Sequence, residues 1–327
     1  MKQKGMTRRE FFIGAAAVGA VPAVAKAMMA GTEFDENLSV FISDIHVSGP
    51  DIKGTLWGDQ PTYQNPYFER AVDEILAMRP RPRRVVCFGD VALWFGFRAD
   101  YEASRPGFGR LTDAGIDVHL AMGNHDRREP FLEVYPQYAK TSPVPGRIVS
   151  VVDLGTCDLI LLDSLDQTKE KEGTPNGVGG TIDRAQWDWL KEESMRRTRP
   201  FFCGAHHDYD ELTLEVEPGK RASVLSFLKN APYFRGWISG HHHFWTKGRI
   251  FKAWNSPDTI RTVILPSTGW KGDIGYATMR TSANRAVLSL VQYDYYFPKP
   301  LGKGVPRPRE WDEIIAENRG QFCTFPL

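Results

Sequence analysis

Apolar runs bounded by polar and glycine-containing segments recur along the chain and indicate β-strands. The predicted strands cover residues 38–42, 83–88, 115–122, 157–164, 200–205 and 235–239, and three consecutive strands follow within 259–296. Early alternation of strands and helices, followed by a β-rich end, predicts an α/β fold with a mixed sheet. No internal repeat or linker-like boundary interrupts this pattern. We therefore expect a single domain over residues 31–327, with a proline-rich extension from about residue 297.

Three segments have the spacing or composition of helices. Residues 65–78 carry four apolar side chains on one helical face: Phe68, Val72, Ile75 and Leu76. Residues 181–197 begin near Thr181 or Asp183, either of which suits a helix N-cap. A short helix is expected near residues 310–318, after the proline-rich stretch.

The N-terminal segment has the three regions of an export signal. A basic start with Arg8 and Arg9 precedes the uncharged run FFIGAAAVGAVPAVA, and small residues in A-x-A spacing follow. The sequence TRREFF resembles the twin-arginine signal, which implies export of a folded protein. We expect residues 1–30 to be a cleaved signal, the twin-arginine machinery to be a partner, and the mature protein to be periplasmic or secreted. A membrane anchor is the alternative, but the run is shorter than the ~20 residues of a stable span.

Charge and cysteine content narrow the possible functions. The net charge of +1 gives no indication of nucleic acid binding. The four cysteines, at positions 87, 157, 203 and 323, include no C-x-x-C pair, which argues against a zinc–thiolate site. An oxidising compartment would permit one disulfide. A protein that folds before export is instead expected to keep its thiols free.

Polar residues of metal-binding types follow five of the apolar runs. The motifs are Asp44-Ile45-His46, Gly89-Asp90, Gly123-Asn124-His125-Asp126, His206-His207 and Gly240-His241-His242-His243. Ligands of α/β proteins gather at the carboxyl ends of strands, so we expect these five loops to converge on one site. Histidine combined with carboxylate suits Zn, Mn or Fe better than Ca.

Spacing predicts which side chains of two motifs point together. On an extended chain, residues two apart share a face and the residue between them points away. Asp44 is therefore expected to pair with His46, and His241 with His243. His242 is expected to point elsewhere.

The motifs D-x-H, G-D, G-N-H-D, H and G-H-x-H resemble, in this order, those of the calcineurin-like metallophosphoesterase family. The resemblance runs from about residue 38 to 295 and implies two stacked mixed β-sheets flanked by helices, in four layers. It also implies a centre of two divalent or trivalent metal ions, such as Mn, Fe or Zn. The implied ligands are Asp44, His46 and His243 for one ion, Asn124, His206 and His241 for the other, and Asp90 as the bridge.

The resemblance implies hydrolysis of a small phosphate ester, either a monoester or a diester. Two divalent ions with Asp44, Asp90 and a bridging hydroxide leave a charge of about +1, which attracts phosphate. Two metal ions ~3.5–4 Å apart can clamp the phosphoryl oxygens and supply the hydroxide nucleophile. In the family pattern His125 is the proton donor near the leaving group, and Asp126 orients it.

Two substrate-binding candidates depend on residues next to the motifs. By motif position His206 rather than His207 is the expected ligand, although this chain has HHDY where the family often has H-H-P or H-x-P. His207 is then a candidate substrate-binding residue. Arg127 suits a phosphate contact, and it equally suits a solvated salt bridge, as does Arg128.

Aromatic residues and one further histidine also have two interpretations. Trp94, Phe95 and Phe97 follow Asp90 and suit either packing under a lid or a wall of the substrate site. His119 lies within an apolar run, where a hydrogen-bonded core residue is expected.

The alternative function is a catalytically inactive metal-binding scaffold of the same fold. An inactive member should lack ligands, whereas every ligand of the pattern and His125 are present here. The sequence therefore favours an enzyme.

Sequencing the N-terminus of the mature protein tests the predicted export. We expect a new N-terminus between residues 25 and 31, because the small residues of the cleavage region lie there. An uncleaved terminus recovered in the membrane fraction would instead support a membrane-tethered protein.

Overall fold

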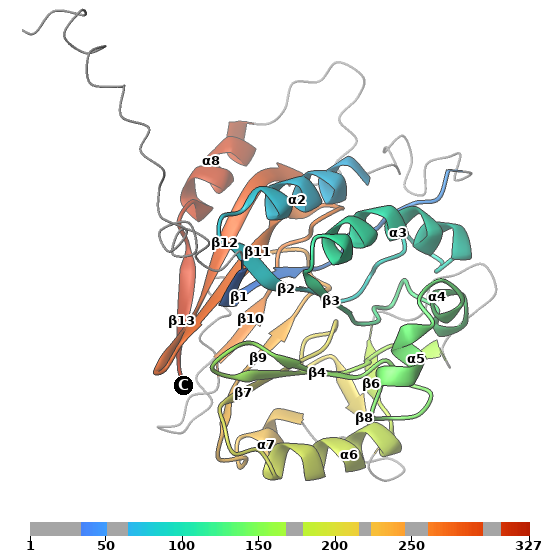
Figure 1. Ribbon diagram of the computed structural model, residues 1–327, viewed down its shortest axis with the longest axis vertical. Helices are drawn as coiled ribbons and strands as arrows, with labels where there is room; N and C mark the ends of the chain where they lie inside the picture. The colour runs from blue at the N-terminus through green and yellow to red at the C-terminus, as the bar shows by residue number, and fades with distance from the viewer. Residues whose placement is uncertain (1–33, 51–64, 168–178, 216–223, 246–260, 297–308) are drawn as a thin grey trace, which may run out of the picture. The chain divides into compact units, whose positions relative to one another are not determined.

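The computed structural model describes residues 34–50, 65–167, 179–215, 224–245, 261–296 and 309–327 (Figure 1). The predicted signal at 1–30 and the proline-rich stretch at 297–308 lie outside these residues. No helix in the described part of the chain is long and apolar enough to cross a membrane.

The first sheet has six strands and is mixed (Figure 1). Their spatial order is β13 (Phe322–Pro326), β12 (Arg285–Tyr296), β11 (Gly272–Ser282), β1 (Phe34–Ile42), β2 (Arg81–Cys87) and β3 (Asp117–Leu120). β1, β2 and β3 run parallel, because the helices α2 (Asn65–Ala77) and α3 (Arg98–Asp113) make the return crossings. β11, β12 and β13 pair antiparallel.

The second sheet has five strands and repeats the same construction. Their order is β10 (Arg261–Ile264), β9 (Phe234–Ser239), β7 (Phe201–Gly204), β5 (Asp158–Leu161) and β4 (Ser150–Asp153). All pairs are parallel except β4 with β5. α6 (Arg184–Met195) lies in the crossing from β5 to β7, and α7 (Val224–Leu228) lies in the crossing from β7 to β9. β6 (Gly180–Ile182) and β8 (Leu212–Leu214) form a separate parallel pair. In the chain, β6 lies between β5 and α6, and β8 lies between β7 and α7.

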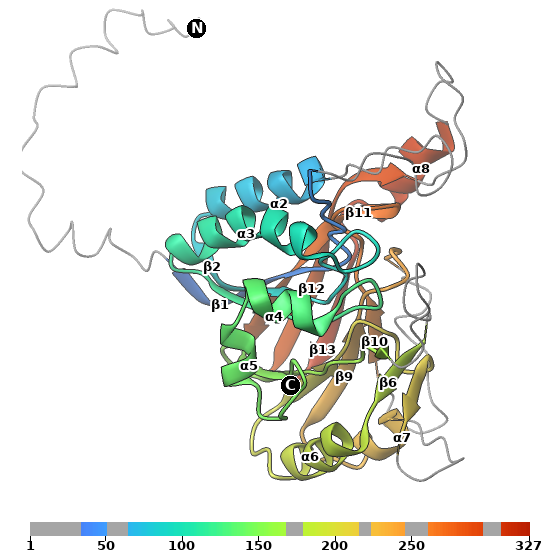
Figure 2. The same ribbon diagram turned by 90° about the vertical axis from the view of Figure 1, so that its right-hand side faces the viewer.

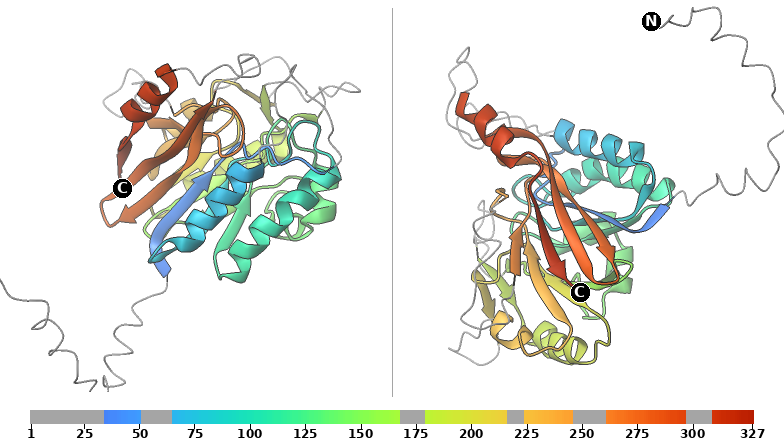
Figure 3. Two further views of the ribbon diagram at one scale, coloured as in Figure 1. Left: turned by 90° about the horizontal axis from the view of Figure 1, so that it is seen from above. Right: turned by 90° about the vertical axis from the view of Figure 1, so that its left-hand side faces the viewer.

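Alternating side chains of β1 show how the layers pack. Val40 and Ile42 join the core beneath α2 and α3, whereas Phe41 joins the core between the two sheets. On the far side of the second sheet, Trp187 of α6 and Leu228 of α7 close a third core. The order is therefore helices, sheet, sheet, helices (Figures 2 and 3). This confirms the predicted fold class.

The predicted helices exist, with small shifts of their ends. In α2 the side chains of Phe68, Val72 and Ile75 are buried, as the spacing predicts. The carboxylate of Asp183 accepts a hydrogen bond from the backbone N–H of Gln186 at 2.9 Å, so Asp183 is the N-cap of α6. Thr181 belongs to β6 instead. The short terminal helix is α8 (Arg309–Asn318).

Several elements were not predicted, and α3 shows why. This helix contains Pro106 and two glycines, which all disfavour a helix interior. Its buried face, which includes Tyr101 and Phe108, packs against the first sheet and overrides that local preference. The other elements missed are short: α4 (Arg128–Val134), α5 (Gln137–Thr141), β4, β6, β8, α7 and β13.

The cysteines have the state that the sequence predicts. All four cysteines are buried and free, which confirms the expected free thiols.

His119 is not a hydrogen-bonded core residue: it is half-buried on the edge strand β3. Its ring lines a cavity of about 580 Å³ together with Phe108, Tyr135 and Tyr138.

The core between the two sheets should carry much of the stability. Phe202 of β7 is fully buried and meets Phe325 of β13 edge-on, with ring centroids 4.9 Å apart. We expect Phe202→Ala to lower the free energy of unfolding by about 3–5 kcal/mol, measured by denaturant titration. Phe322→Ala, at a side chain 59% exposed on β13, is the control, with an expected change within about 0.5 kcal/mol. Equal losses would contradict this description of the core.

Candidate metal centre

Five strand ends converge on one site, as the motifs predict. β1, β2 and β3 of the first sheet end before the loops that carry Asp44, Asp90 and Asn124. β7 and β9 of the second sheet end before His206 and His241. Backbone hydrogen bonds join the first two loops: the N–H of Asp44 donates to the carbonyl of Gly89 at 3.1 Å, and the N–H of His46 to that of Asp90 at 3.0 Å.

The predicted extended geometry of the two spaced motifs is wrong. Asp44, His46, His241 and His243 have φ angles of 52°, 45°, 70° and 64°, which lie in the left-handed region. They follow the strands β1 and β9 rather than belonging to them, and the turns direct their side chains inward. Ile45 and His242 do point elsewhere, as expected: Ile45 joins a hydrophobic core, and Nε2 of His242 lies 3.1 Å from a carboxylate oxygen of Glu211.

Glycines before two of the motifs are required by close packing. A Cβ on Gly240 would lie 1.9 Å from Oγ of Ser43 and 2.7 Å from Oδ2 of Asp44. A Cβ on Gly123 would lie 2.2 Å from Oδ1 of Asp90. These distances are far below contact, so only glycine lets the loops of different strands approach one another here.

The first group of side chains consists of Asp44, His46, Asp90 and His243, all buried, whose ligand atoms lie within 4.8 Å of one another. Nε2 of His243 lies 3.1 Å from Oδ1 of Asp44 and 3.3 Å from Nε2 of His46. Nδ1 of His46 lies 3.0 Å from the carbonyl oxygen of Leu93. This bond fixes the proton on Nδ1 and leaves the Nε2 lone pair for a metal ion.

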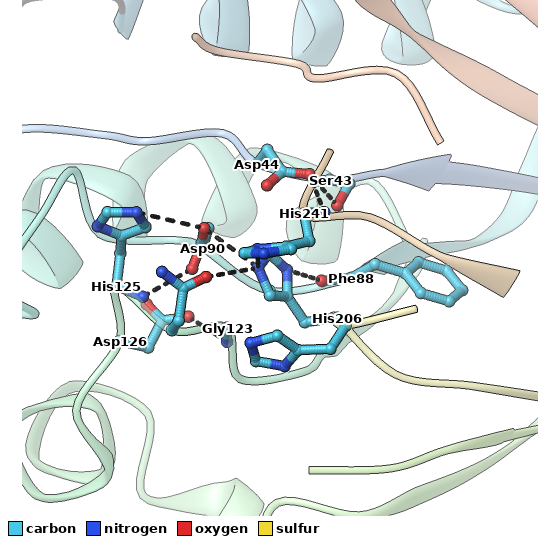
Figure 4. Close-up of polar contacts among 12 residues, drawn as sticks. Ser43, Asp44, Phe88, Asp90, Gly123, His125, Asp126, His206 and His241 are labelled. Carbon is cyan, nitrogen blue, oxygen red and sulfur yellow. Dashed lines mark hydrogen bonds and ion pairs between the residues drawn. The ribbon is translucent and has the colours of Figure 1, made fainter. Parts of the chain in front are cut away.

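The second group is centred on His206. Its Nε2 lies 3.1 Å from Oδ1 of Asn124, 3.2 Å from Nδ1 of His241 and 3.2 Å from Oδ2 of Asp90. Its Nδ1 donates to the carbonyl oxygen of Phe88 at 2.8 Å, which again leaves Nε2 as the ligand atom (Figure 4).

Asp90 lies between the two groups. Its Oδ2 is 3.2 Å from Nε2 of His206, and its Oδ1 accepts a hydrogen bond from the N–H of His125 at 2.8 Å (Figure 4). Oδ2 also lies 3.7 Å from Nε2 of His46. One carboxylate oxygen therefore reaches both groups. This is the position that a bridging ligand needs.

The carboxylates of the site are held ionised. Burial alone would raise the pKa of Asp44, but the neighbouring His243 and His206 outweigh it and keep the pKa below its usual value. Burial likewise opposes the charge of Asp90, whose pKa is lowered well below its usual value by His206 and His125. Ionised carboxylates are the form that binds metal ions.

Most histidines of the site are held neutral. Burial lowers the pKa of His46 to about 3 and that of His241 to about 4. His206 differs: burial would lower its pKa, but Asp90 and Asp44 raise it to about 9. His206 must therefore lose a proton to become a ligand, so metal binding here is expected to release protons.

Orphaned polar atoms show that the residues fit a metal centre. Oδ1 of Asp44, Nδ1 of His243 and Nε2 of His207 are buried and have no hydrogen-bond partner. Each such atom costs about 1–3 kcal/mol unless something else satisfies it. A metal ion bound by the first group would satisfy Oδ1 of Asp44, and the Asp and His clusters are compatible with a dinuclear centre.

His125 lies beside Asp90, but Asp126 is not its partner. Nε2 of His125 lies 3.9 Å from Oδ2 of Asp90, and its Nδ1 is 3.1 Å from the carbonyl oxygen of Trp94. The carboxylate of Asp126 instead accepts hydrogen bonds from the N–H groups of Gly123 at 2.8 Å and Ala92 at 3.0 Å. Asp126 therefore holds two loops together, because its short side chain points toward the backbone of the loop after β2.

His206 and His207 are now distinguished by their contacts. His206 faces Asp90 and Asn124. His207 is also buried, and its ligand atom lies within 4.8 Å of those of His206 and His241. Its Nδ1 is 2.8 Å from Oγ of Ser164.

The two arginines after His125 differ. Arg128 forms a fork with Asp163, Nε and Nη2 each 2.7 Å from a carboxylate oxygen. It is thus a salt bridge, but a largely buried one rather than the solvated one expected, because the side chain of Asp163 is fully buried. Arg127 is buried, and its Nη1 donates to the carbonyl oxygen of Asp126 at 3.0 Å.

Sequence reasoning missed Trp270, which packs edge-on against His46 and His243, at ring-centroid distances of 5.2 and 5.8 Å. Trp270 follows no strand-end motif of metal-ligand types, so no sequence signal connects it with the site. The backbone carbonyls of Phe88 and Leu93 were missed for a simpler reason. Every residue has such a group, and only the fold selects these two.

Comparison with known proteins identifies the family and the fold. A family model described as calcineurin-like phosphoesterase matches residues 39–244. Among solved structures, the chain is similar to a dimetal phosphatase from Danio rerio, with 16% identity and a TM-score of 0.55, over 78% of this chain and 96% of that one. No curated protein matches the chain.

Two further solved structures are less similar to the chain. A 5'-nucleotidase precursor from Thermus thermophilus has 15% identity and a TM-score of 0.45, over 75% of this chain and 51% of that one. A Vps29 from Entamoeba histolytica complexed with zinc has 12% identity and a TM-score of 0.35, over 78% and 92%. The family match, by contrast, spans more than half of the chain. With the converging Asp and His clusters, it shows that this chain belongs to the calcineurin-like phosphoesterase family, a membership that supports metal-dependent hydrolysis of phosphate esters.

Proposed function

We propose that this protein is an exported, dinuclear-metal-dependent phosphoesterase that hydrolyses small phosphomonoesters or phosphodiesters. One observation carries the proposal: Oδ2 of Asp90 lies 3.7 Å from Nε2 of His46 in one group and 3.2 Å from Nε2 of His206 in the other. A single bridging carboxylate between two sets of neutral or deprotonatable ligands suits a pair of metal ions better than one ion.

The proposed ligands are those that the motifs indicate. Asp44, His46 and His243 would hold one ion, Asn124, His206 and His241 would hold the other, and Asp90 would bridge them. Two bound ions would polarise the phosphoryl oxygens and lower the pKa of a coordinated water.

His125 would supply the proton for the leaving alcohol. Its Nδ1–H donates to the carbonyl oxygen of Trp94, so Nε2, on the Asp90 side of the ring, would carry the transferable proton when the imidazole is in its charged form. Because the partner of Nδ1 is a backbone carbonyl, the orientation of the ring depends on the loop after Asp90.

Metal content tests the ligand assignment. We expect the purified protein reconstituted with Mn²⁺ or Zn²⁺ to bind about two ions per chain, and His243→Ala to bind about one, measured by elemental analysis after desalting. His242→Ala is the matched control, because His242 lies against Glu211 and should leave the metal content unchanged. Loss of metal in both variants, or in neither, would contradict the assignment.

Turnover tests the reaction. With Mn²⁺, we expect hydrolysis of a chromogenic phosphomonoester or phosphodiester, and His125→Ala should lower kcat by about 10²–10⁴-fold, since it removes the proton donor. Asp90→Ala should abolish turnover by disrupting the metal pair.

His119→Gln, at a half-buried histidine on the edge strand β3, should retain wild-type activity. A metal-loaded wild-type protein that turns over neither ester would favour the inactive scaffold.

A further inference from the structure

Two tryptophans cover one side of the candidate metal centre. The Trp270 ring packs edge-on against the rings of His46 and His243, with centroids 5.2 and 5.8 Å away. The Trp94 ring lies 4.6 Å from the His125 ring at a tilt of 42° and meets Trp270 edge-on at 6.0 Å. The aromatic cover therefore runs from the proposed proton donor to the first metal group.

Trp270 is held rigidly beside the ligands. The N–H of Gly269 donates to the carbonyl of Asp44 at 3.0 Å, and that of Asp273 to the carbonyl of His243 at 2.9 Å. The ammonium of Lys271 lies 4.9 Å from the centre of the Trp270 ring, where a cation is attracted to the aromatic face. This lysine also adds positive charge near a site for anionic phosphate.

From Trp94 the aromatic surface continues outward. Phe95 lies 6.3 Å from Trp94 and 5.6 Å from Phe97, between ring centroids. Trp94 and Phe95 are half-buried, and Phe97 is 53% exposed. Apolar side chains this large usually contribute to a core, so a partly exposed row of them beside a polar site indicates a binding surface.

We propose that Trp94, Phe95, Phe97 and Trp270 bind an aromatic ring in the leaving group, so that the preferred substrates are phosphate esters of alcohols carrying a planar aromatic ring. This inference rests on the proposed function. It follows from the position of His125: an alcohol that takes its proton from Nε2 lies beside the Trp94 ring, 4.6 Å from the imidazole. Ring stacking there would hold the leaving group while the phosphoryl group lies at the metal ligands.

A simpler role for Trp94 would be to position His125. The contact that fixes the imidazole, however, comes from the backbone carbonyl of Trp94, which survives any substitution of its side chain. A positioning role would also affect all phosphate esters equally, whereas a binding surface for aromatic rings would not. The two roles therefore differ in a measurable way.

Binding of two phosphonates, which cannot be hydrolysed, tests the surface without turnover. We expect phenylphosphonate to bind the Mn²⁺-loaded protein about tenfold more tightly than methylphosphonate in calorimetric titrations, because only the former can stack. Trp94→Ala should remove most of this difference, and Trp94→Phe should restore most of it. Trp189→Leu, at a half-buried tryptophan of α6, is the control and should leave the ratio unchanged.

Kinetics gives the second measurement. We compare kcat/KM for phenyl phosphate and methyl phosphate in each protein, since the ratio between variants cancels the intrinsic reactivity of the esters. Trp94→Ala should lower the phenyl-to-methyl ratio about tenfold.

Equal losses on both esters, or equal affinity for both phosphonates in the wild type, would overturn the inference and leave the proposed function intact. Failure of both phosphonates to bind would count against the proposed function, and this inference would fall with it.

Discussion

The carboxylate of Asp90 is the group on which the rest of the site depends. A buried ionised carboxylate is costly unless its charge is compensated and its oxygens are engaged. Here Oδ1 accepts the N–H of His125, while Oδ2 lies among the ring nitrogens of His206 and His46. Removing this charge would leave the histidines of both groups facing one another without an anion between them.

This arrangement requires an unusual backbone. Asp44, His46, Asp90, His241 and His243 all adopt left-handed φ angles without being glycine, at about 1–2 kcal/mol each. Such strain persists only where the surrounding structure determines it fully. In this chain the determinants are the hydrogen bonds that join the loop after β1 to the loop after β2 and to the turn before β11. The three apolar cores behind these loops add to that restraint.

Much of the fold followed from periodicity, because the buried strands and the amphipathic helices α2 and α6 bury the residues that their patterns indicate. The motifs likewise predicted which loops converge, since residue types and strand ends are both visible in a sequence. The local backbone geometry was not predictable from the sequence. Asp44 and His46 lie in left-handed turns rather than on the extended strand that their spacing indicated. Asp126 was misassigned because a carboxylate next to a histidine in sequence can turn toward backbone N–H groups instead. α3 was missed because tertiary packing outweighs its proline and glycines.

Each candidate metal group takes its side chains from both sheets. Asp44 and His46 follow a strand of the first sheet, whereas His243 follows a strand of the second; Asn124 and His206 are divided in the same way. The site thus lies between loops of the two sheets, and the distances between its donor atoms depend on how the two sheets are stacked. A change in the apolar layer between them, far from any ligand, would alter the spacing of the donor atoms. Residues such as Phe41 and Phe202, which lie in the core between the sheets, therefore also help to set the spacing of the metal-ligand atoms.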